Sequence, residues 1–149
     1  MSVSHHEAAQ TTPKSNVRGV VVRGSAAGFA QEITIGEHHL TADEPAGPTP
    51  YDLLLAALGS CTSMTLGMYA RRNAWPLESV TVRLRHSRIH AEDCAECETK
   101  AMMLDRIECV IQLTGALTGE QRAKLLAIAD KCPVHRTLVS EINIQTRLV

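Results

Sequence analysis

One segment limits what this chain can fold into: a continuous helical pattern from residue 49 to residue 73. Thr49 is a good N-cap residue, Pro50 suits the first helical turn, and Asp52 places a carboxylate near the positive end of the helix dipole. The pattern stops before Trp75 and Pro76, because proline cannot continue a helix. The sequence therefore predicts one long helix over 49–73.

This predicted helix is apolar on nearly every side. One stripe recurs at steps of three and four residues: Leu54, Ala57, Leu58, Cys61, Met64 and Met68. Further apolar residues cover much of the other side: Leu53, Leu55, Ala56, Leu66 and Ala70. Such a helix is buried on most of its faces, so we expect it at the centre of the fold. Because one chain of 149 residues is short for that purpose, we expect a homodimer that packs two such helices together.

Alternating apolar and polar residues predict strands on both sides of this helix. Before it, two β-branched segments separated by a glycine-bearing loop indicate a hairpin, with a short third strand after it. Beyond the helix, two segments alternate as half-buried strands do. The predicted strands cover residues 17–23, 29–35, 38–41, 80–85 and 107–114. Strands, a buried helix, and more strands with a second helix make the fold class α+β.

The C-terminal part adds two helical segments. Thr118 and Gln121 have the spacing of a capping box for a helix over 119–131. Pro133 ends that helix, and residues 134–140 fit a short helical turn.

The two ends of the chain differ in pattern. Residues 141–149 alternate again and predict a last strand, with Ile142, Ile144 and Leu148 facing inward. Residues 1–16 are polar without an apolar period and predict a disordered or loosely held tail. We therefore expect a single domain over residues 17–149.

Charge and composition argue against several kinds of partner. The net charge is −1 and the pI is near 6.6, whereas a nucleic-acid surface is basic. Aromatic residues make up only 3%, so few side chains are available for stacking on bases. The longest unbroken apolar run, residues 53–58, is far shorter than a bilayer span, and the N-terminus lacks the apolar core of a secretory signal. We expect a cytoplasmic protein without nucleic-acid or membrane partners.

The chain has five cysteines. Because the number is odd and no export signal precedes them, a framework of structural disulfides is not expected. Cys109 occupies an inward position of its predicted strand, so it is interpreted as a small buried hydrophobic residue.

Cys94 and Cys97 form a Cys-x-x-Cys motif that follows His86 and His90. Two histidines and two cysteines can close a tetrahedral zinc site, which indicates a metal-binding or sensing module as one alternative function. A redox pair is a second interpretation, although the acidic neighbours oppose a reactive thiolate and no helix pattern follows the motif. A plain polar loop between two strands is the third.

Cys61 and Cys132 lie on the apolar face of a predicted helix or at its end, so both should point towards one interior. Pro133 suits a first helical turn and makes Cys132 an N-cap, where backbone donors, the helix dipole and neighbouring basic residues favour a thiolate. Cys61 lies inside its helix and needs a cation from elsewhere, such as an arginine. Two inert thiols and a binder of small apolar ligands are the alternatives.

Two motifs resemble a known family. GPTPYDLLLAALGSC, at residues 47–61, closely resembles the helix that carries the first cysteine of the OsmC/Ohr family. CPVHRTL, at residues 132–138, resembles that family's second cysteine motif, and the order and separation of the two motifs also match. The resemblance implies an intertwined homodimer, in which antiparallel sheets from both chains wrap two long central helices and the active sites lie at the subunit interface.

The same resemblance implies a thiol-dependent peroxidase that acts on organic hydroperoxides or hydrogen peroxide and needs no cofactor. Cys61 would attack the peroxide and become a sulfenic acid, and Cys132 would resolve it to a Cys61–Cys132 disulfide. A thiol or dithiol reductant would then reduce this disulfide.

In the hydroperoxide-resistance branch of the family, an arginine from the N-terminal strands and a glutamate at the start of the helix hold the first cysteine ready. Arg23 is our first choice for the arginine and Arg18 the second. Tyr51 occupies the glutamate position, and Asp52 follows it, rotated by about 100 degrees on a helix. Asp52 is therefore either the catalytic acid or a carboxylate at the helix end, and the chain departs from that branch.

Overall fold

Three short antiparallel strands stand at the start of the described chain, which in this computed structural model comprises residues 19–42, 47–98 and 102–149. β1 (Val20–Gly24), β2 (Gln31–Ile35) and β3 (His38–Ala42) form one sheet in sequence order. The predicted hairpin and third strand are confirmed, because β1 pairs antiparallel with β2 and β2 with β3. The predicted tail over 1–16 lies outside the described residues.

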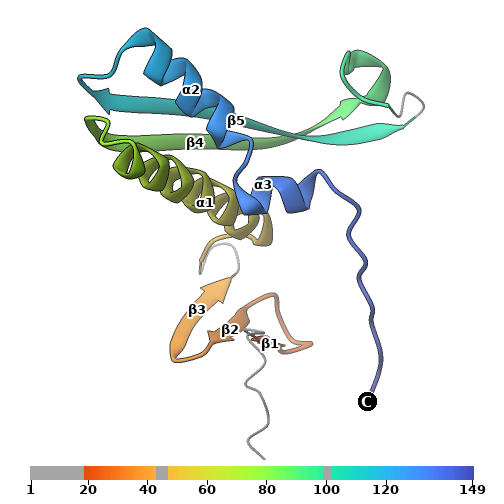
Figure 1. Cartoon of the computed structure of the whole chain (residues 1–149). Coiled ribbons are helices and arrows are strands. Elements are labelled where there is room, and N and C mark those ends of the chain that lie inside the picture. Colours follow the sequence, from red (N-terminus) through yellow and green to blue (C-terminus); the bar gives the residue numbers. More distant parts are fainter. Residues whose placement is uncertain (1–18, 43–46, 99–101) are drawn as a thin grey trace, which may run out of the picture. The chain divides into compact units, whose positions relative to one another are not determined.

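The chain divides into two compact units, Met1–Gly47 and Pro48–Val149. The three-stranded sheet belongs to the first unit, and all remaining elements belong to the second. The α+β class predicted from the sequence is confirmed (Figure 1).

The long helix α1 spans Pro50–Arg72, with Thr49 as N-cap and Asn73 as C-cap, as predicted. Its start is a reciprocal capping box. The Asp52 backbone N–H donates to Thr49 Oγ1 at 3.1 Å, and the Thr49 backbone N–H donates to Asp52 Oδ2 at 2.9 Å. Two of the otherwise unpaired N–H groups at the helix start are thereby satisfied.

The buried face of α1 differs from the predicted apolar stripe. Leu58, Gly59, Thr62, Leu66 and Ala70 are buried, whereas Ala57, Met64 and Met68 are exposed. The buried face is rotated about the helix axis relative to the predicted stripe, because a strand approaches the helix closely at Gly59. A Cβ atom at this position would lie 2.7 Å from Leu84 Cδ1. Within one chain, the described elements cover one side of α1, and the predicted position of this helix at the centre of the fold is confirmed.

A long hairpin lies against α1. β4 (Leu77–His90) pairs antiparallel with β5 (Met103–Gly115), and Leu84 lies opposite Cys109. Both strands are longer than predicted and reach a short 3-10 helix, η1 (Ala91–Asp93). In Figure 1, α1 and α2 run along this hairpin.

Two further helices complete the second unit. α2 (Gly119–Ala129) begins with the predicted capping box of Thr118 and Gln121 and ends two residues before the predicted boundary. α3 (Pro133–Leu138) is the predicted short helix. The core lies between α1, α2 and one face of the hairpin, at these buried residues: Leu66, Leu125, Ile128 and Ala129.

Residues 141–149 form no strand, contrary to the sequence prediction. Ile142, Ile144 and Leu148 are 51%, 82% and 98% exposed. An alternating segment forms a strand only where a neighbouring strand can hydrogen bond to its backbone. Among the described residues, the strands of the two sheets pair with one another and not with residues 141–149.

By length and composition alone, α1 is apolar enough to cross a membrane, with a mean hydropathy of 1.4 over its best 18-residue window. The central helix of a soluble protein meets the same criterion. Here α1 packs against β4, α2 and α3, which is the behaviour of a core helix.

Candidate functional site

Cys61 and Cys132 meet in the second unit, as the sequence predicts. Cys61 lies in the middle of α1, and Cys132 is the N-cap of α3, directly after α2. Their side chains are hydrogen bonded to each other. Cys132 is fully buried at 0% exposure, whereas Cys61 is partly accessible.

Cys132 is the member of the pair whose ionisation its surroundings favour. Burial opposes its ionisation, but several donors outweigh that cost and lower the pKa of its thiol below the ordinary value. The groups that lower it are the Cys61 thiol, the His135 and Val134 backbone N–H groups, and the Thr62 hydroxyl, which itself donates to the Leu58 carbonyl at 2.9 Å. The thiolate predicted from the position of Cys132 at a helix start is therefore supported.

Cys61 keeps its proton. Burial and its hydrogen bond to Cys132 raise the pKa of the Cys61 thiol, and the negative charge of Cys132 adds to the effect. The Val134 backbone N–H and the Thr65 hydroxyl act in the opposite direction without reversing it. Of the two coupled thiols, the buried Cys132 therefore ionises more readily than the accessible Cys61.

A cavity of about 220 Å³ is lined by residues that neighbour the thiol pair, although neither Cys61 nor Cys132 is among its lining residues. Leu58, one helical turn before Cys61, and His135, whose backbone N–H acts on the Cys132 sulfur, both line it. Most of its wall is aliphatic, and its remaining lining residues are Asp105, Ile107, Cys109, Leu138 and Val139. Its size and lining suit a small, largely apolar molecule.

Cys109 is exposed rather than buried, so its interpretation as a core residue is wrong. Its side chain lines the 220 Å³ cavity instead of packing against other residues. Partial burial, followed by the charges of Asp130 and Cys132, raises the pKa of its thiol. Cys109 is therefore a protonated thiol beside the reactive pair.

Cys94 and Cys97 are joined by a disulfide, the bond that the redox-pair interpretation of this motif requires. In the described parts of the chain, no three His, Cys, Asp or Glu side chains form a group that could hold a metal ion. His86 does not face these cysteines but bonds Asp105, with Nε2 and Oδ1 2.8 Å apart. The structure thus gives no support to the four-residue zinc site.

Tyr51 and Asp52 occupy the helix start where the resemblance places a glutamate. The Tyr51 ring stacks on His86, with ring centroids 4.4 Å apart. The Asp52 carboxylate accepts the Thr49 backbone N–H in the capping box. The interpretation of Asp52 as a helix-end carboxylate therefore matches its observed partner.

Arg23 lies on β1 of the first unit, in register with Glu32 of β2. Arg18, the second choice, lies outside the described residues. Within the second unit, the groups that act on the Cys61 thiol are neutral donors and Cys132, and no described cation is among them.

Sequence reasoning missed Thr62 and Thr65, whose hydroxyls act on Cys132 and Cys61. Thr65 lies four residues after Cys61 on the same helix face, a spacing that was available as a signal. No local signal could have linked Thr62 to Cys132, because that contact exists only after α3 packs against α1.

The fold and the site define a class of protein: an α+β protein in which a long helix carries one cysteine and a short helix start carries a second cysteine bonded to it. Residues 41–147 match the family model of the OsmC-like protein. The chain belongs to this family.

Solved structures share the fold at low sequence identity. An OsmC-like protein from Mycoplasma pneumoniae has a TM-score of 0.66 at 16% identity, with 82% of this chain and 86% of that chain covered. The organic hydroperoxide resistance protein OhrB of Bacillus subtilis has a TM-score of 0.58 at 19% identity, with coverage of 83% and 90%. The organic hydroperoxide resistance protein OsmC from Legionella pneumophila has 0.61 at 17%, with coverage of 83% and 89%. No curated protein matches the chain.

Proposed function

We propose that this chain is a cysteine-based peroxidase that reduces organic hydroperoxides or hydrogen peroxide through Cys61 and Cys132. The observation that carries the proposal is the hydrogen-bonded thiol pair, in which the buried Cys132 thiol has a lowered pKa and the Cys61 thiol is accessible. The family includes proteins named for hydroperoxide resistance, which supports the same chemistry.

In the proposed reaction, the Cys132 thiolate accepts the Cys61 proton through their hydrogen bond, and the Cys61 sulfur attacks the peroxide. Cys61 is the attacking residue because a peroxide cannot reach a sulfur with 0% exposure. The O–O bond breaks, one oxygen stays on Cys61 as a sulfenic acid, and the alkoxide leaves as an alcohol with the proton from Cys132.

The second step uses the thiolate that this proton transfer regenerates. Cys132 attacks the Cys61 sulfur, a disulfide forms, and the hydroxide that leaves takes a proton from solvent to become water. The peroxide has then gained the two electrons that the two sulfurs lost. An external thiol or dithiol would return the pair to its reduced state.

The aliphatic cavity beside the pair supports organic hydroperoxides as the substrate class. Leu58, Ile107 and Leu138 offer apolar walls to an alkyl group, and nothing in these walls selects strongly among alkyl shapes. By the family resemblance, Arg23 is proposed as the cation that stabilises the attacking Cys61 thiolate.

One oxidising turnover tests this proposal. The chain, with Cys61 and Cys132 reduced, is mixed with one equivalent of cumene hydroperoxide, and its mass is measured. We expect a loss of two hydrogens, about 2 Da, located in a linked Cys61–Cys132 peptide. In Cys132→Ser we expect the gain of one oxygen on Cys61 instead. An unchanged mass while peroxide is consumed would contradict the proposed role of the pair.

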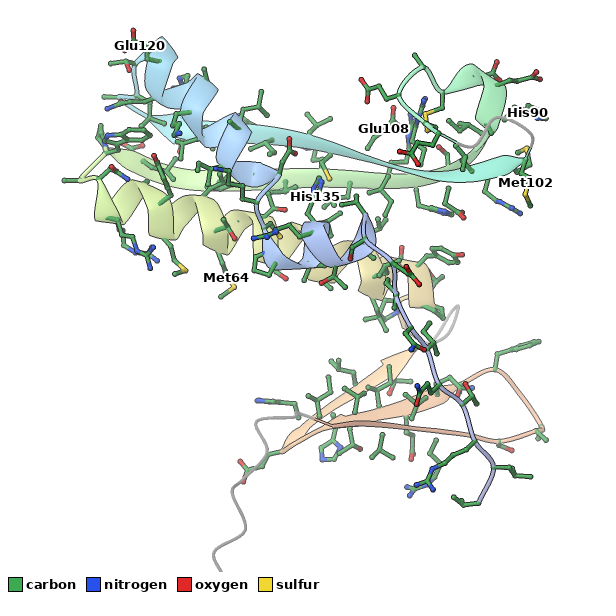
Figure 2. All side chains as sticks on the ribbon, turned by 45° about the vertical axis from the view of Figure 1, so that its right-hand side comes forward. Met64, His90, Met102, Glu108, Glu120 and His135 are labelled. Atoms are coloured by element: carbon green, nitrogen blue, oxygen red, sulfur yellow. A yellow bond between two sulfur atoms is a disulfide. The ribbon has the colours of Figure 1, made fainter. Side chains whose placement is uncertain are left out.

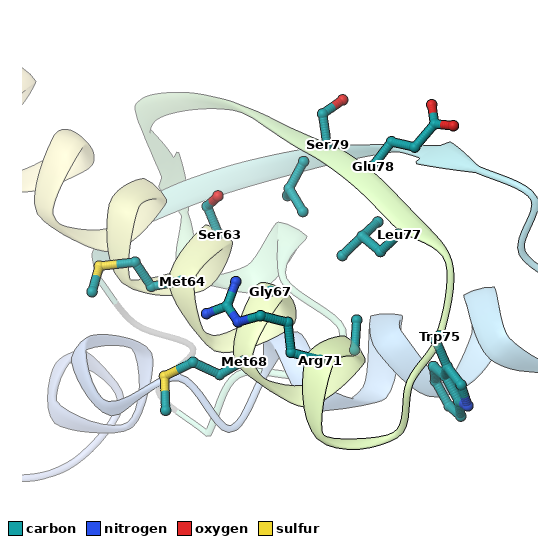
Figure 3. Close-up of a pocket in the computed structure, with 11 residues that line it drawn as sticks. Ser63, Met64, Gly67, Met68, Arg71, Trp75, Leu77, Glu78 and Ser79 are labelled. Carbon is teal, nitrogen blue, oxygen red and sulfur yellow. The ribbon is translucent and has the colours of Figure 1, made fainter.

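A homodimer with active sites at the subunit interface is part of the proposal. The exposed side of α1 presents Met64 and Met68, which are 66% and 45% exposed. They border a cavity of about 410 Å³, shown in Figure 3 with Arg71 and Trp75. The unpaired segment 141–149 also carries exposed isoleucines. A second chain would cover the apolar side of α1 and offer strands to this segment.

Light scattering at micromolar concentration tests the assembly. We expect a mass of twice 16.2 kDa for the chain. A species with the mass of one chain would contradict the dimer while leaving the thiol chemistry untouched.

A further inference from the structure

The Cys94–Cys97 disulfide has no part in the peroxide reaction described above. It closes a ring over a separation of three residues, with Cα atoms 5.4 Å apart, directly after η1. Cys94 is 8% exposed and Cys97 is partly accessible. In Figure 2, His90 and Met102 mark this end of the β4–β5 hairpin, at the opposite end from Glu120.

The hairpin end is held by other bonds besides the disulfide. The strand ladder continues to the pair His90 and Met103. Beyond it, the Ala91 backbone N–H donates to the Met102 carbonyl at 2.7 Å, and the Cys94 N–H donates to the Ala91 carbonyl at 3.2 Å. A disulfide that closes so small a ring also restricts the unfolded chain less than one that closes a long loop. The Cys94–Cys97 disulfide therefore adds little to the stability of the folded chain.

Distance separates this disulfide from the Cys61–Cys132 pair within one chain. Leu84 lies against Gly59, two residues before Cys61 on α1. Six residues of β4 separate Leu84 from His90, a span of about 20 Å in an extended strand. No side-chain rotation crosses that span, so the Cys61–Cys132 pair of the same chain cannot exchange electrons directly with Cys94 and Cys97.

The segment that carries the disulfide is acidic. Four carboxylates, Glu92, Asp93, Glu96 and Glu98, are exposed on residues 91–98, and this segment contains no lysine, arginine or histidine. An approaching thiol with a positive charge nearby is therefore attracted, and one with a negative charge is repelled.

We propose that Cys94 and Cys97 are a second redox couple of this chain, which exchanges two electrons with an external dithiol carried on a basic surface. A thiolate of that dithiol attacks the Cys97 sulfur, which is the more accessible of the two. The Cys94–Cys97 bond breaks, and Cys94 leaves as a thiolate that takes up a proton. The second thiolate of the dithiol then attacks its own sulfur in the mixed disulfide and releases Cys97, which is protonated in turn. The dithiol ends as a disulfide, and the couple ends as two thiols.

A redox titration tests this proposal in the full chain. Wild type and Cys61→Ser/Cys132→Ser are equilibrated with mixtures of reduced and oxidised dithiothreitol, trapped by alkylation, and analysed at the peptide that carries Cys94 and Cys97. We expect a reversible transition from one-tenth to nine-tenths reduced over about an 80-fold change in the dithiothreitol ratio, since both sulfurs react as one two-electron couple. The midpoint should agree within twofold between the two proteins, because the site pair is not involved.

Three results would overturn the proposal: a bond that stays oxidised until the protein unfolds, a pair that never oxidises, or one zinc ion bound per reduced chain. The double variant lacks the peroxide-reducing pair, so this titration keeps its meaning if the proposed peroxidase function fails. No variant at Cys94 or Cys97 is needed, so a folding defect cannot obscure the result.

Charge provides the second readout. Cysteamine, a cationic thiol, should open the disulfide faster than anionic 3-mercaptopropionate after correction for thiolate fraction. The ratio of the cysteamine rate to the 3-mercaptopropionate rate should fall at least twofold when the salt concentration is raised from 0.05 M to 0.5 M. This change shortens the screening length about threefold and so weakens the attraction between charges. An equal rate for both thiols at low salt would overturn the basic surface of the partner.

Discussion

Replacing Cys61 by serine is expected to slow the reduction of cumene hydroperoxide by at least about a thousandfold, because serine supplies no sulfur to accept the peroxide oxygen. The first-turnover rate, followed by peroxide loss in stopped flow, measures this effect. Cys132→Ser should still react, but only once, because no second sulfur is present to release the oxygen as water. Its Cys61 should persist as a sulfenic acid or become over-oxidised.

A double variant of matched chemistry provides the control. Cys94→Ser/Cys97→Ser removes two sulfurs from the far end of the hairpin and should keep the first-turnover rate within about twofold.

In the same series, Arg23→Ala should lower the rate by roughly a hundredfold if Arg23 is the stabilising cation. An unchanged rate for Arg23→Ala together with a loss for Arg18→Ala would transfer that role to Arg18. Equal rates for wild type and Cys61→Ser would remove Cys61 from the mechanism.

The pH dependence of the wild-type rate follows from the two shifted thiols. The lowered pKa of Cys132 means that its thiolate forms as the pH rises through a midpoint below the ordinary range of cysteine. The singly protonated pair is the reactive form, so the rate should rise through that midpoint, level off, and fall again at higher pH, where Cys61 with its raised pKa also loses its proton. A rise centred above the ordinary thiol pKa would indicate that Cys61 ionises without the help of Cys132.

Replacing Leu125 by alanine is expected to lower the free energy of unfolding by about 3 kcal/mol, within a usual range of roughly 2 to 5 kcal/mol. Leu125 is 0% exposed and belongs to the core between α1, α2 and the hairpin, where the lost methyl groups leave a cavity. Urea unfolding at fixed protein concentration measures the change, since a dimer would make stability depend on concentration.

The neighbouring residue on α2 is a matched control. Leu126 is 64% exposed, so Leu126→Ala should change the free energy of unfolding by less than about 0.5 kcal/mol. Equal losses for both variants would show that α2 presents a different face to α1. A loss confined to Leu126→Ala would place its contact on a surface formed with another chain.

Local features of the fold could be predicted because their causes are local. Thr49 with Asp52 and Thr118 with Gln121 form capping boxes within three residues of each other, and both helices start where these pairs stand. The strand pattern of β4 and β5 was found for the same reason, since alternation is visible in a few successive residues. The full length of these strands was not predicted. Both strands extend past the alternating segment, because backbone hydrogen bonds between them continue beyond it.

Features that depend on a partner distant in sequence were predicted poorly. Residues 141–149 alternate as a strand does, yet the described residues give them no strand to pair with. The exposed position of Cys109 depends on a cavity that α1, α3 and β5 create together. The rotation of the buried face of α1 depends on the contact between Gly59 and Leu84, which helix periodicity does not contain.

The helix starts, the α+β class and the two cysteine motifs that mark the family could be recognised in the amino-acid sequence. Which of the two thiols ionises more readily depends on the folded chain. The lowered pKa of Cys132 results from burial and from groups on two elements, Thr62 of α1 and the amides at the start of α3, which act on Cys132 together. The energy of a proton is set by everything within a few ångströms of it, and that neighbourhood exists only once the chain has folded.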